Sequence, residues 1–376
     1  MHICDARYFS ASGRVEIGGN HTDHQRGRVL AAAVGLEITA AASPNGTDVV
    51  WLDYDVFGTD EIVLTNLKAD PDEKGTSAAL VRGVAEWFVL HGRAIGGFNA
   101  RIATSIPMGA GLSSSAAYAV LIGNIFKGLF GADVSPIEIA QAGQYAENVH
   151  FGKPCGLMDQ AASSFGGLNV IDFADPQNPI VVPVRAELSG YSMCVVDTGG
   201  SHADLTPDYA SCATEMKAVA RHFGKEYLRE VDACDFRSSI GSLRYLGDRA
   251  VLRAIHFFGE NERVLLQAAA LESGDIKAFM GHVIESGRSS MALLQNVYSP
   301  SNPQQQGLTL ALAMSERILA GTGAWRVHGG GFAGTILAFV PDGQKKAYRC
   351  QLGGVFGEDH CHFLNIRREG GGEVSE

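Results

Sequence analysis

A glycine- and serine-rich segment at residues 107–117 has the clearest chemical pattern in the chain. It reads Pro-Met-Gly-Ala-Gly-Leu-Ser-Ser-Ser-Ala-Ala and leads into an apolar helix. Free backbone N–H groups at a helix start, preceded by flexible glycine, form an anion site. Serine hydroxyls add donors to phosphate or a ligand for Mg²⁺. One serine would suffice to cap an ordinary helix, so three in a row favour a phosphate cradle.

A second segment, residues 13–27, places Arg14, Asn20, His21, Asp23 and His24 between glycines. Polar side chains on a glycine-rich loop flanked by apolar strands indicate a site for a hydroxyl-rich ligand. Two alternatives stay open for this loop. His21, Asp23 and His24 could hold a metal ion, or the loop could be a solvated polar turn.

Two acidic residues are candidates for chemistry. Asp159 lies in Cys-Gly-Leu-Met-Asp-Gln, where a carboxylate is costly to bury unless it is paired. This makes it a candidate base with an arginine partner, against the alternative of a helix-capping residue. Glu147 follows Ala140 and Gly143 on one face of a helix, and these small neighbours leave room for a ligand. The alternative is a solvated glutamate.

Two weaker patterns have structural explanations. Gly329, Gly331 and Gly334 form a literal G-x-G-x-x-G, but the β-branched run that follows ends at Pro341 and predicts a strand. A glycine turn between two strands is therefore favoured over a dinucleotide site. His360 and His362 share one strand face, where a polar edge is favoured over a metal site. No Walker-type phosphate loop is present.

The elements that must position these segments are mixed. Strands are predicted within residues 15–67, at 98–105, at 168–198 and again after residue 324, and helices at about 76–91, 114–129 and 205–295. Another helix begins after Ser135, where Glu138 completes a capping box, and ends near residue 152. Without strict β-α-β alternation, the class is α+β. The glycine-rich tail at 370–373 is predicted to fray.

Composition excludes several classes of protein. The 376 residues are 46% apolar and 19% charged, which is typical of a folded chain with a large core, and the length suggests two domains. No run of eighteen apolar residues occurs, so no membrane-spanning helix is expected. The net charge of -11 argues against a nucleic-acid partner. Seven scattered cysteines and an N-terminus without a signal-peptide pattern indicate a cytoplasmic protein.

Together the motifs resemble the GHMP small-molecule kinase superfamily, and within it the galactokinases. GRVEIGGNHTDHQRG resembles the galactokinase opening signature, PMGAGLSSSAA the phosphate-binding loop, VHGGGFAG the third glycine-rich motif, and CGLMDQ the segment with the catalytic aspartate. The resemblance implies an α+β, two-domain GHMP kinase fold. A ribosomal S5 domain 2-like N-terminal domain would span residues 1–165 and a ferredoxin-like C-terminal domain residues 166–376, with the active site between them.

The resemblance also implies an ATP-dependent sugar 1-kinase that converts galactose to galactose 1-phosphate. Asp159 would be the base and Arg14 its charge partner, and Ser115 and Glu147 would hold Mg²⁺. The expected ligands are ATP and a monosaccharide, with neither nucleic acid nor membrane. Residues implied at the ATP phosphates are Gly109, Ala110, Gly111, Leu112, Ser113, Ser114 and Ser115. Those implied at the sugar are Asn20, His21, Asp23, Gly156 and Tyr209, and Gly329, Gly330 and Gly331 would shape the wall.

The sequence departs from the usual signature G-R-V-N-L-I-G-E-H-T-D-Y. Asn20 stands where the family has glutamate and His24 where it has tyrosine, which predicts a broader or shifted sugar range that Asn20→Glu would narrow towards galactose. Ser77 replaces a tryptophan that could stack on adenine. A kinase for another aldose or polyol and a non-catalytic sugar and ATP sensor are the rival hypotheses. The presence of Asp159 and Arg14 favours an enzyme.

Overall fold

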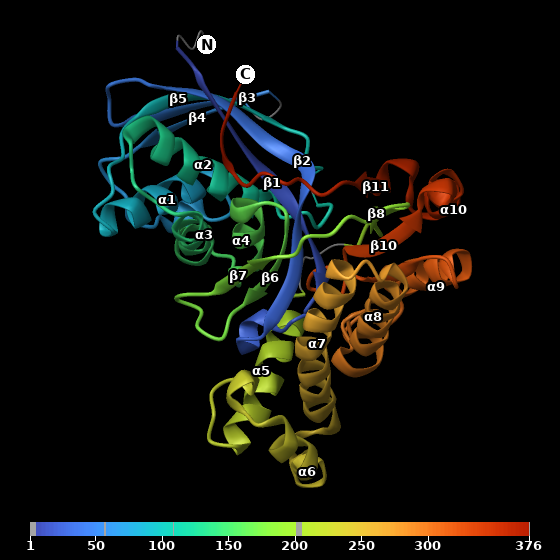
Figure 1. The fold of residues 1–376 in the computed structure, drawn as a ribbon. Coiled ribbons are helices and arrows are strands. Elements are labelled where there is room, and N and C mark those ends of the chain that lie inside the picture. Colours follow the sequence, from blue (N-terminus) through green and yellow to red (C-terminus); the bar gives the residue numbers. More distant parts are fainter. Residues whose placement is uncertain (1–4, 56–57, 108, 201–204, 376) are drawn as a thin grey trace.

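The structure is a computed structural model that describes residues 5–55, 58–107, 109–200 and 205–375. Residues 1–4, on which the signal-peptide expectation partly rests, and Met108 of the phosphate segment lie outside the described residues. Two β-sheets with helices around them form the described chain, in agreement with the predicted α+β class (Figure 1). No described helix is both long and apolar enough to cross a membrane.

The larger sheet has eight strands in the order β12-β1-β2-β5-β3-β4, and β6 pairs with β2 and β7. Every pair is antiparallel except β3 with β5. Helices α1 to α4 lie together on one side of this sheet (Figure 1). The strands are β1 (Arg7–Gly18), β2 (Arg28–Pro44), β3 (Val49–Tyr54), β4 (Gly58–Val63), β5 (Phe98–Thr104), β6 (Leu168–Asp172), β7 (Ile180–Pro183) and β12 (Gly372–Val374).

The smaller sheet has the antiparallel order β11-β8-β10-β9. Along the chain its elements follow a β-α-β-β-α-β order, which is the ferredoxin-like arrangement expected for this part. Its strands are β8 (Tyr191–Asp197), β9 (Ala324–Val327), β10 (Thr335–Pro341) and β11 (Cys361–Leu364). One continuous hydrophobic cluster joins the two sheets, because Val195 and Phe339 pack in the same core as Phe9 of β1.

The predicted helices are confirmed with small changes at their ends. The capping box forms at the start of α3, where Ser135 accepts from the Glu138 backbone and Glu138 accepts in return. The helix continues as a π-helical segment, Ala146–Phe151, which ends next to Gly152 as predicted, although the change to π-helical geometry was not expected. The helices are α1 (Ser77–Leu90), α2 (Ser114–Phe130), α3 (Pro136–Tyr145), α4 (Met158–Phe165), α5 (Thr206–His222), α6 (Ala233–Leu243), α7 (Asp248–Glu272), α8 (Ile276–Ser289), α9 (Gly307–Leu319) and α10 (Lys345–Phe356).

The C-terminal tail corrects one expectation. Residues 372–374 form β12 and pair with β1 instead of fraying. The chain reaches this strand through a close approach, since a Cβ on Gly370 would lie 2.2 Å from the Ser164 carbonyl oxygen. Glycine at position 370 therefore allows the tail backbone to pack directly against the backbone of α4. Three strands that follow residue 165, namely β6, β7 and β12, also join the larger sheet, and the domain division at residue 165 stays a prediction.

Candidate active site

A buried ion pair joins β1 to α4. Arg14 Nε donates to Asp159 Oδ1 at 2.7 Å, and the two side chains are 7% and 17% exposed. Burial alone would raise the pKa of Asp159. The Arg14 charge and its hydrogen bond outweigh that effect and lower the pKa of Asp159 to about 2. Asp159 is therefore a carboxylate at neutral pH, held in one orientation by its partner.

The predicted phosphate loop surrounds this ion pair. Arg14 Nη1 donates to the Gly111 carbonyl at 2.7 Å, and Ser113 Oγ donates to Asp159 Oδ2 at 2.5 Å. Since the Ser113 hydroxyl is used in this way, it makes no capping bond to the helix, and the first turn of α2 has no side-chain cap. The helix start thus retains backbone N–H groups that can bind an anion, which favours the phosphate cradle over an ordinary serine cap.

A second carboxylate lies beside the helix start. Glu147 is fully buried in the π-helical segment, and its Oε1 accepts from Ser115 Oγ. Its Oε2 accepts from Gln160 Nε2 at 2.5 Å and from Cys155 Sγ at 3.1 Å. Lys153 Nζ lies 3.6 Å from Glu147 Oε1. Ser115 and Glu147 therefore present two hard oxygen atoms together, which is the donor set that Mg²⁺ accepts alongside ATP phosphates.

A cavity of about 1080 Å³ opens at these residues. It is lined by the phosphate loop on one side and by residues of α5 and the β9–β10 turn on the other. A smaller cavity of about 250 Å³ adjoins it and shares Arg14 and Asp159. This smaller space is lined by Arg14, Glu16, His21, Asp23, His24, Pro154, Cys155, Gly156, Met158, Asp159, Gly329 and Gly330.

Asp23 and Gly156 meet on the wall of the smaller cavity. A Cβ on Gly156 would lie 2.1 Å from Asp23 Oδ2, so only glycine leaves room for the carboxylate. Burial raises the pKa of Asp23 to about 6, although its hydrogen bond from the His24 backbone N–H acts in the opposite direction. Asp23 thus places a hydrogen-bond acceptor on the wall of the smaller cavity.

Two histidines form an ordered chain beside Asp23. His21 Nε2 lies 2.9 Å from the Gly330 carbonyl and must donate to it, so His21 Nδ1 accepts from His24 Nε2 at 3.1 Å. Burial lowers the pKa of His21 to about 4 and holds the pKa of His24 well below its usual value, so both rings are neutral. Among the described residues, no group of three or more His, Cys, Asp or Glu side chains is arranged to hold a metal ion.

The third glycine motif forms the turn between β9 and β10, as predicted, instead of a dinucleotide site. Tyr209 Oη donates to the Gly331 carbonyl at 2.9 Å, and both residues line the larger cavity. The candidates that line one of the two cavities are Arg14, His21, Asp23, Gly109, Ala110, Gly111, Leu112, Ser113, Ser114, Ser115, Gly156, Asp159, Tyr209, Gly329, Gly330 and Gly331. Glu147 lines neither cavity but accepts a hydrogen bond from Ser115.

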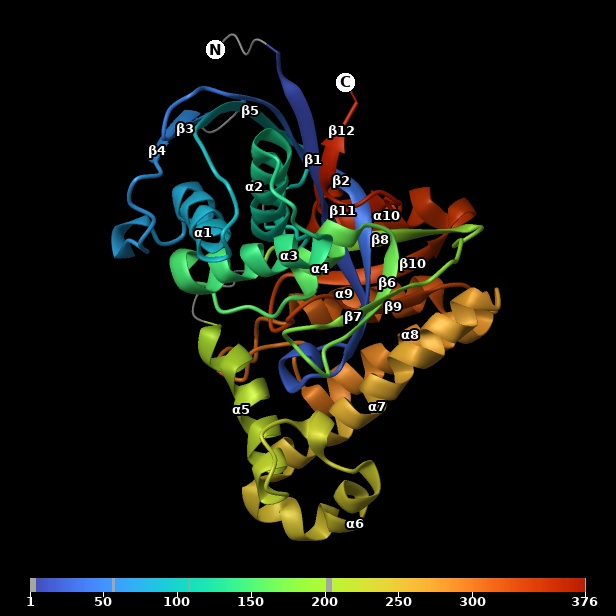
Figure 2. The ribbon, with the colours of Figure 1, turned by 60° about the vertical axis from the view of Figure 1, so that its left-hand side comes forward.

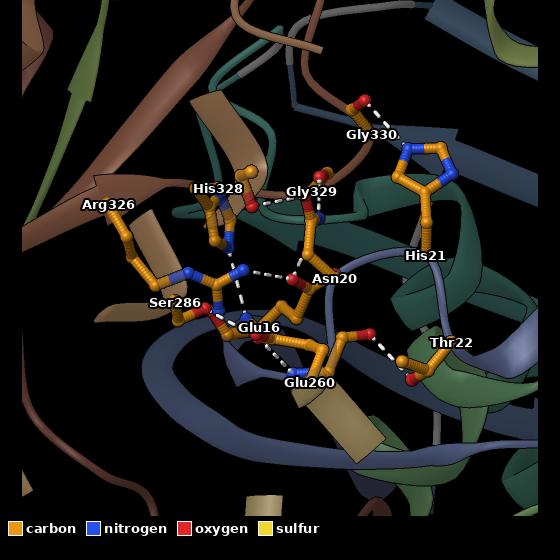
Figure 3. Close-up of polar contacts among 12 residues, drawn as sticks. Glu16, Asn20, His21, Thr22, Glu260, Ser286, Arg326, His328, Gly329 and Gly330 are labelled. Carbon is orange, nitrogen blue, oxygen red and sulfur yellow. Dashed lines mark hydrogen bonds and ion pairs between the residues drawn. The ribbon is translucent and has the colours of Figure 1, made fainter. Parts of the chain in front are cut away.

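Asn20 lies in a buried hydrogen-bond network. Its side chain is fully buried and lines neither of these two cavities. Its Nδ2 donates to Glu16 Oε1 at 3.0 Å and to the Gly329 carbonyl at 2.6 Å (Figure 3). Its Oδ1 accepts from Asn296 Nδ2 at 2.9 Å. The structure thus does not place Asn20 on the wall of either cavity, and the direct sugar contact implied by the resemblance stays a prediction.

Sequence reasoning missed two residues of the site. Glu16 lies on the wall of the smaller cavity, and Lys153 Nζ lies 3.4 Å from Ser115 Oγ. The signal for Glu16 was available, because it follows Arg14 by two positions and so shares its side of the strand. Lys153 follows Gly152 outside any Walker-type motif, so no local pattern marks it.

The comparisons with known proteins agree with this geometry. The family described as GHMP kinases N terminal domain matches residues 79–167, and the galactokinase galactose-binding signature matches residues 4–44. Solved structures share the fold. A Lactococcus lactis galactokinase complexed with galactose gives a TM-score of 0.85 at 24% identity over 99% of this chain and 96% of that chain. Methanococcus jannaschii mevalonate kinase gives 0.68 at 15% identity over 97% and 99%. Fold and site together define a GHMP-type kinase.

Curated relatives narrow this class. A galactokinase of Actinobacillus pleuropneumoniae serotype 5b (strain L20) is 31% identical over 92% of this chain and 88% of its own length. A galactokinase of Haemophilus influenzae (strain ATCC 51907 / DSM 11121 / KW20 / Rd) is 31% identical over 88% and 84%. The chain therefore belongs to the galactokinase family, whose members are phosphotransferases with an alcohol group as acceptor.

Proposed function

We propose that the protein transfers the γ-phosphoryl group of ATP to the 1-hydroxyl of galactose. The observation that carries the proposal is the Arg14–Asp159 pair. It contacts the phosphate loop through Gly111 and Ser113 and also borders the smaller cavity with Asp23. A nucleotide in the loop and a sugar in the smaller cavity would therefore meet at this pair. Membership of the galactokinase family supports the choice of sugar.

Asp159 would accept the proton of the 1-hydroxyl. As the oxygen forms its bond to the γ-phosphorus, the bond from that phosphorus to the β–γ bridging oxygen breaks and ADP leaves. A pKa of about 2 makes Asp159 a weak base, so its main contribution is to orient the hydroxyl until the proton becomes acidic late in the reaction. Arg14 would neutralise charge on the transferred group. Phosphoryl transfer depends mostly on such positioning and charge neutralisation.

Ser115 and Glu147 would hold Mg²⁺ together with the ATP phosphates. Their oxygen atoms are already in hydrogen-bond contact, and Oε2 of Glu147 is fixed by Gln160, so the carboxylate would need little rearrangement. When bound, the ion supplies charge neutralisation at the β- and γ-phosphate oxygens. Lys153 adds a positive charge on the same side.

The sugar would be held by His21, Asp23 and Tyr209, with Gly156 keeping space beside Asp23. The His21 ring supports a rigid wall, since it bonds to His24 in its own loop and to the Gly330 carbonyl of the β9–β10 turn. We also propose a cytoplasmic location. Six free cysteines among the described residues support a reducing compartment.

The experiment that tests this function is a panel of monosaccharides and polyols with ATP and Mg²⁺, in which ADP release is followed. Galactose is expected to give the highest kcat/KM. Stronger turnover with another aldose or with a polyol would reassign the substrate, and sugar binding without ADP release would indicate a sensor.

The pH dependence of sugar use provides a further prediction. With a pKa of about 6, Asp23 is a carboxylate above that pH and becomes protonated below it. The sugar KM is therefore expected to rise several-fold as the pH falls through about 6, while the KM for ATP stays unchanged. Asp23→Asn should raise the sugar KM at neutral pH and remove this dependence. A sugar KM that is constant across this range in the unmodified protein would contradict the prediction.

A further inference from the structure

Glu16 is a buried carboxylate at the wall of the smaller cavity. Its residue is 4% exposed, and it lies two positions after Arg14 on β1. Arg14, Val15 and Glu16 pair in regular register with Ala33, Ala32 and Ala31 of β2. Arg14 and Glu16 therefore point to the same side of the strand, about 7 Å apart along it. That separation is comparable to the span of a hexose including its hydroxyl groups.

Both hydrogen bonds to the Glu16 carboxylate are accepted by one of its two oxygens, Oε1. Oε1 accepts from Arg326 Nη2 at 2.7 Å and from Asn20 Nδ2 at 3.0 Å (Figure 3). Arg326 is fully buried and also donates to the Glu16 carbonyl at 3.2 Å. Among the residues that the structure describes, none donates a hydrogen bond to Oε2. A buried carboxylate with an unpartnered oxygen on a cavity wall is an acceptor site prepared for a ligand.

Glu16 and Asn20 exchange the acid and the amide of the family signature. In G-R-V-N-L-I-G-E-H-T-D-Y an amide precedes an acid by four positions, whereas this chain has Glu16 first and Asn20 second. The two side chains are in hydrogen-bond contact, so exchanging them keeps an acid–amide pair. The exchange moves the negative charge from position 20 to position 16.

We propose that Glu16 determines sugar specificity, an inference that rests on the proposed function. Its Oε2 accepts a hydrogen bond from a sugar hydroxyl remote from the phosphorylated one, and Asn20 is a positioning residue that holds Glu16 and the Gly329 carbonyl. The distance along β1 supports a remote hydroxyl, because Arg14 marks the end of the cavity where phosphoryl transfer would occur. The two buried partners on Oε1 fix the direction in which Oε2 faces.

The test compares galactose with its 3-deoxy, 4-deoxy and 6-deoxy analogues in the unmodified protein and in Glu16→Gln. The kcat/KM for galactose is divided by the kcat/KM for each deoxy sugar. For the analogue that lacks the hydroxyl bound by Glu16, this ratio is expected to be about tenfold lower in Glu16→Gln than in the unmodified protein. Such a ratio is independent of how much of the variant is folded. Glu260→Gln is the matched control, because Glu260 is equally buried, pairs with Arg263 and lines neither cavity. Its ratios should stay unchanged.

The exchange itself provides a second readout. Asn20→Glu alone is expected to lower kcat/KM for galactose at least about tenfold, because two carboxylates would then crowd one buried site and the Gly329 carbonyl would lose its donor. Adding Glu16→Asn should restore most of the loss, since it returns the pair to the family order. Asn20→Glu that instead sharpens galactose preference would overturn the proposal.

The possible failures are distinguishable. If the unmodified protein phosphorylates galactose and Glu16→Gln changes no ratio, Glu16 is structural and this proposal alone is overturned. If the unmodified protein releases no ADP with any sugar, the proposed function fails and this proposal fails with it.

Discussion

Asp159→Asn is expected to lower kcat by about 10²-fold or more while the protein stays folded. Asparagine keeps the shape of the side chain and can still bond to Arg14 and Ser113, which hold Asp159 through its two oxygens. It cannot carry the negative charge that orients the sugar hydroxyl or take up its proton. The measurement is steady-state turnover with galactose and ATP, together with the melting temperature of each protein.

Asp172→Asn is the matched control for this variant. Asp172 also forms a partly buried arginine pair, with Arg28 at 2.7 Å and Arg229 at 2.9 Å, but it does not line the larger cavity. Loss of that pair should affect stability and leave kcat unchanged. Near-normal turnover of Asp159→Asn would remove Asp159 from the mechanism.

Glu147→Gln is expected to reduce kcat/KM for ATP by about 10²-fold and to raise the Mg²⁺ concentration needed for half-maximal activity. Glutamine can retain the contacts to Gln160 and Cys155 through its oxygen, while its amide group faces Ser115. The fold should therefore persist, but the site would lose one charged oxygen ligand. Activity is measured as Mg²⁺ is titrated at constant ATP.

Glu86→Gln is the control for the second variant. Glu86 Oε2 lies 2.7 Å from His150 Nε2, so it contacts the same π-helical segment without contacting Ser115. Its Mg²⁺ dependence should match that of the unmodified protein. An unchanged Mg²⁺ requirement in Glu147→Gln would show that the ion, if used, is held elsewhere.

Local patterns in the sequence predicted most of the elements. The capping box of Ser135 and Glu138 and the apolar spacing of α1 depend on residues within a few positions, and both are confirmed. The course of the tail at β12 was missed, because it depends on contacts with β1 and α4 more than 200 positions away. Figure 2 shows β12 beside β1 at the end of the larger sheet. Glycine in the sequence gives no indication of such distant packing.

The candidate site was predicted where a motif is continuous. The phosphate loop and the Asp159 segment each follow a local pattern, and the fold brings them into contact. The orientation of Asn20 and Glu16 could not be predicted in this way. Arg326, which fixes Glu16, lies 310 positions away along the chain, so the wall of the smaller cavity is set by tertiary structure. The π-helical segment that holds Glu147 likewise has no local signal.

Identification of the product tests the central claim most directly. The protein is incubated with ATP, Mg²⁺ and galactose, with Asp159→Asn as the parallel control, and the mixture is examined by phosphorus NMR. The account predicts equal amounts of ADP and a galactose phosphate whose phosphorus couples to the proton on C1, with little of either in the control. Phosphorus at another carbon, or ADP accompanied only by inorganic phosphate, would contradict it.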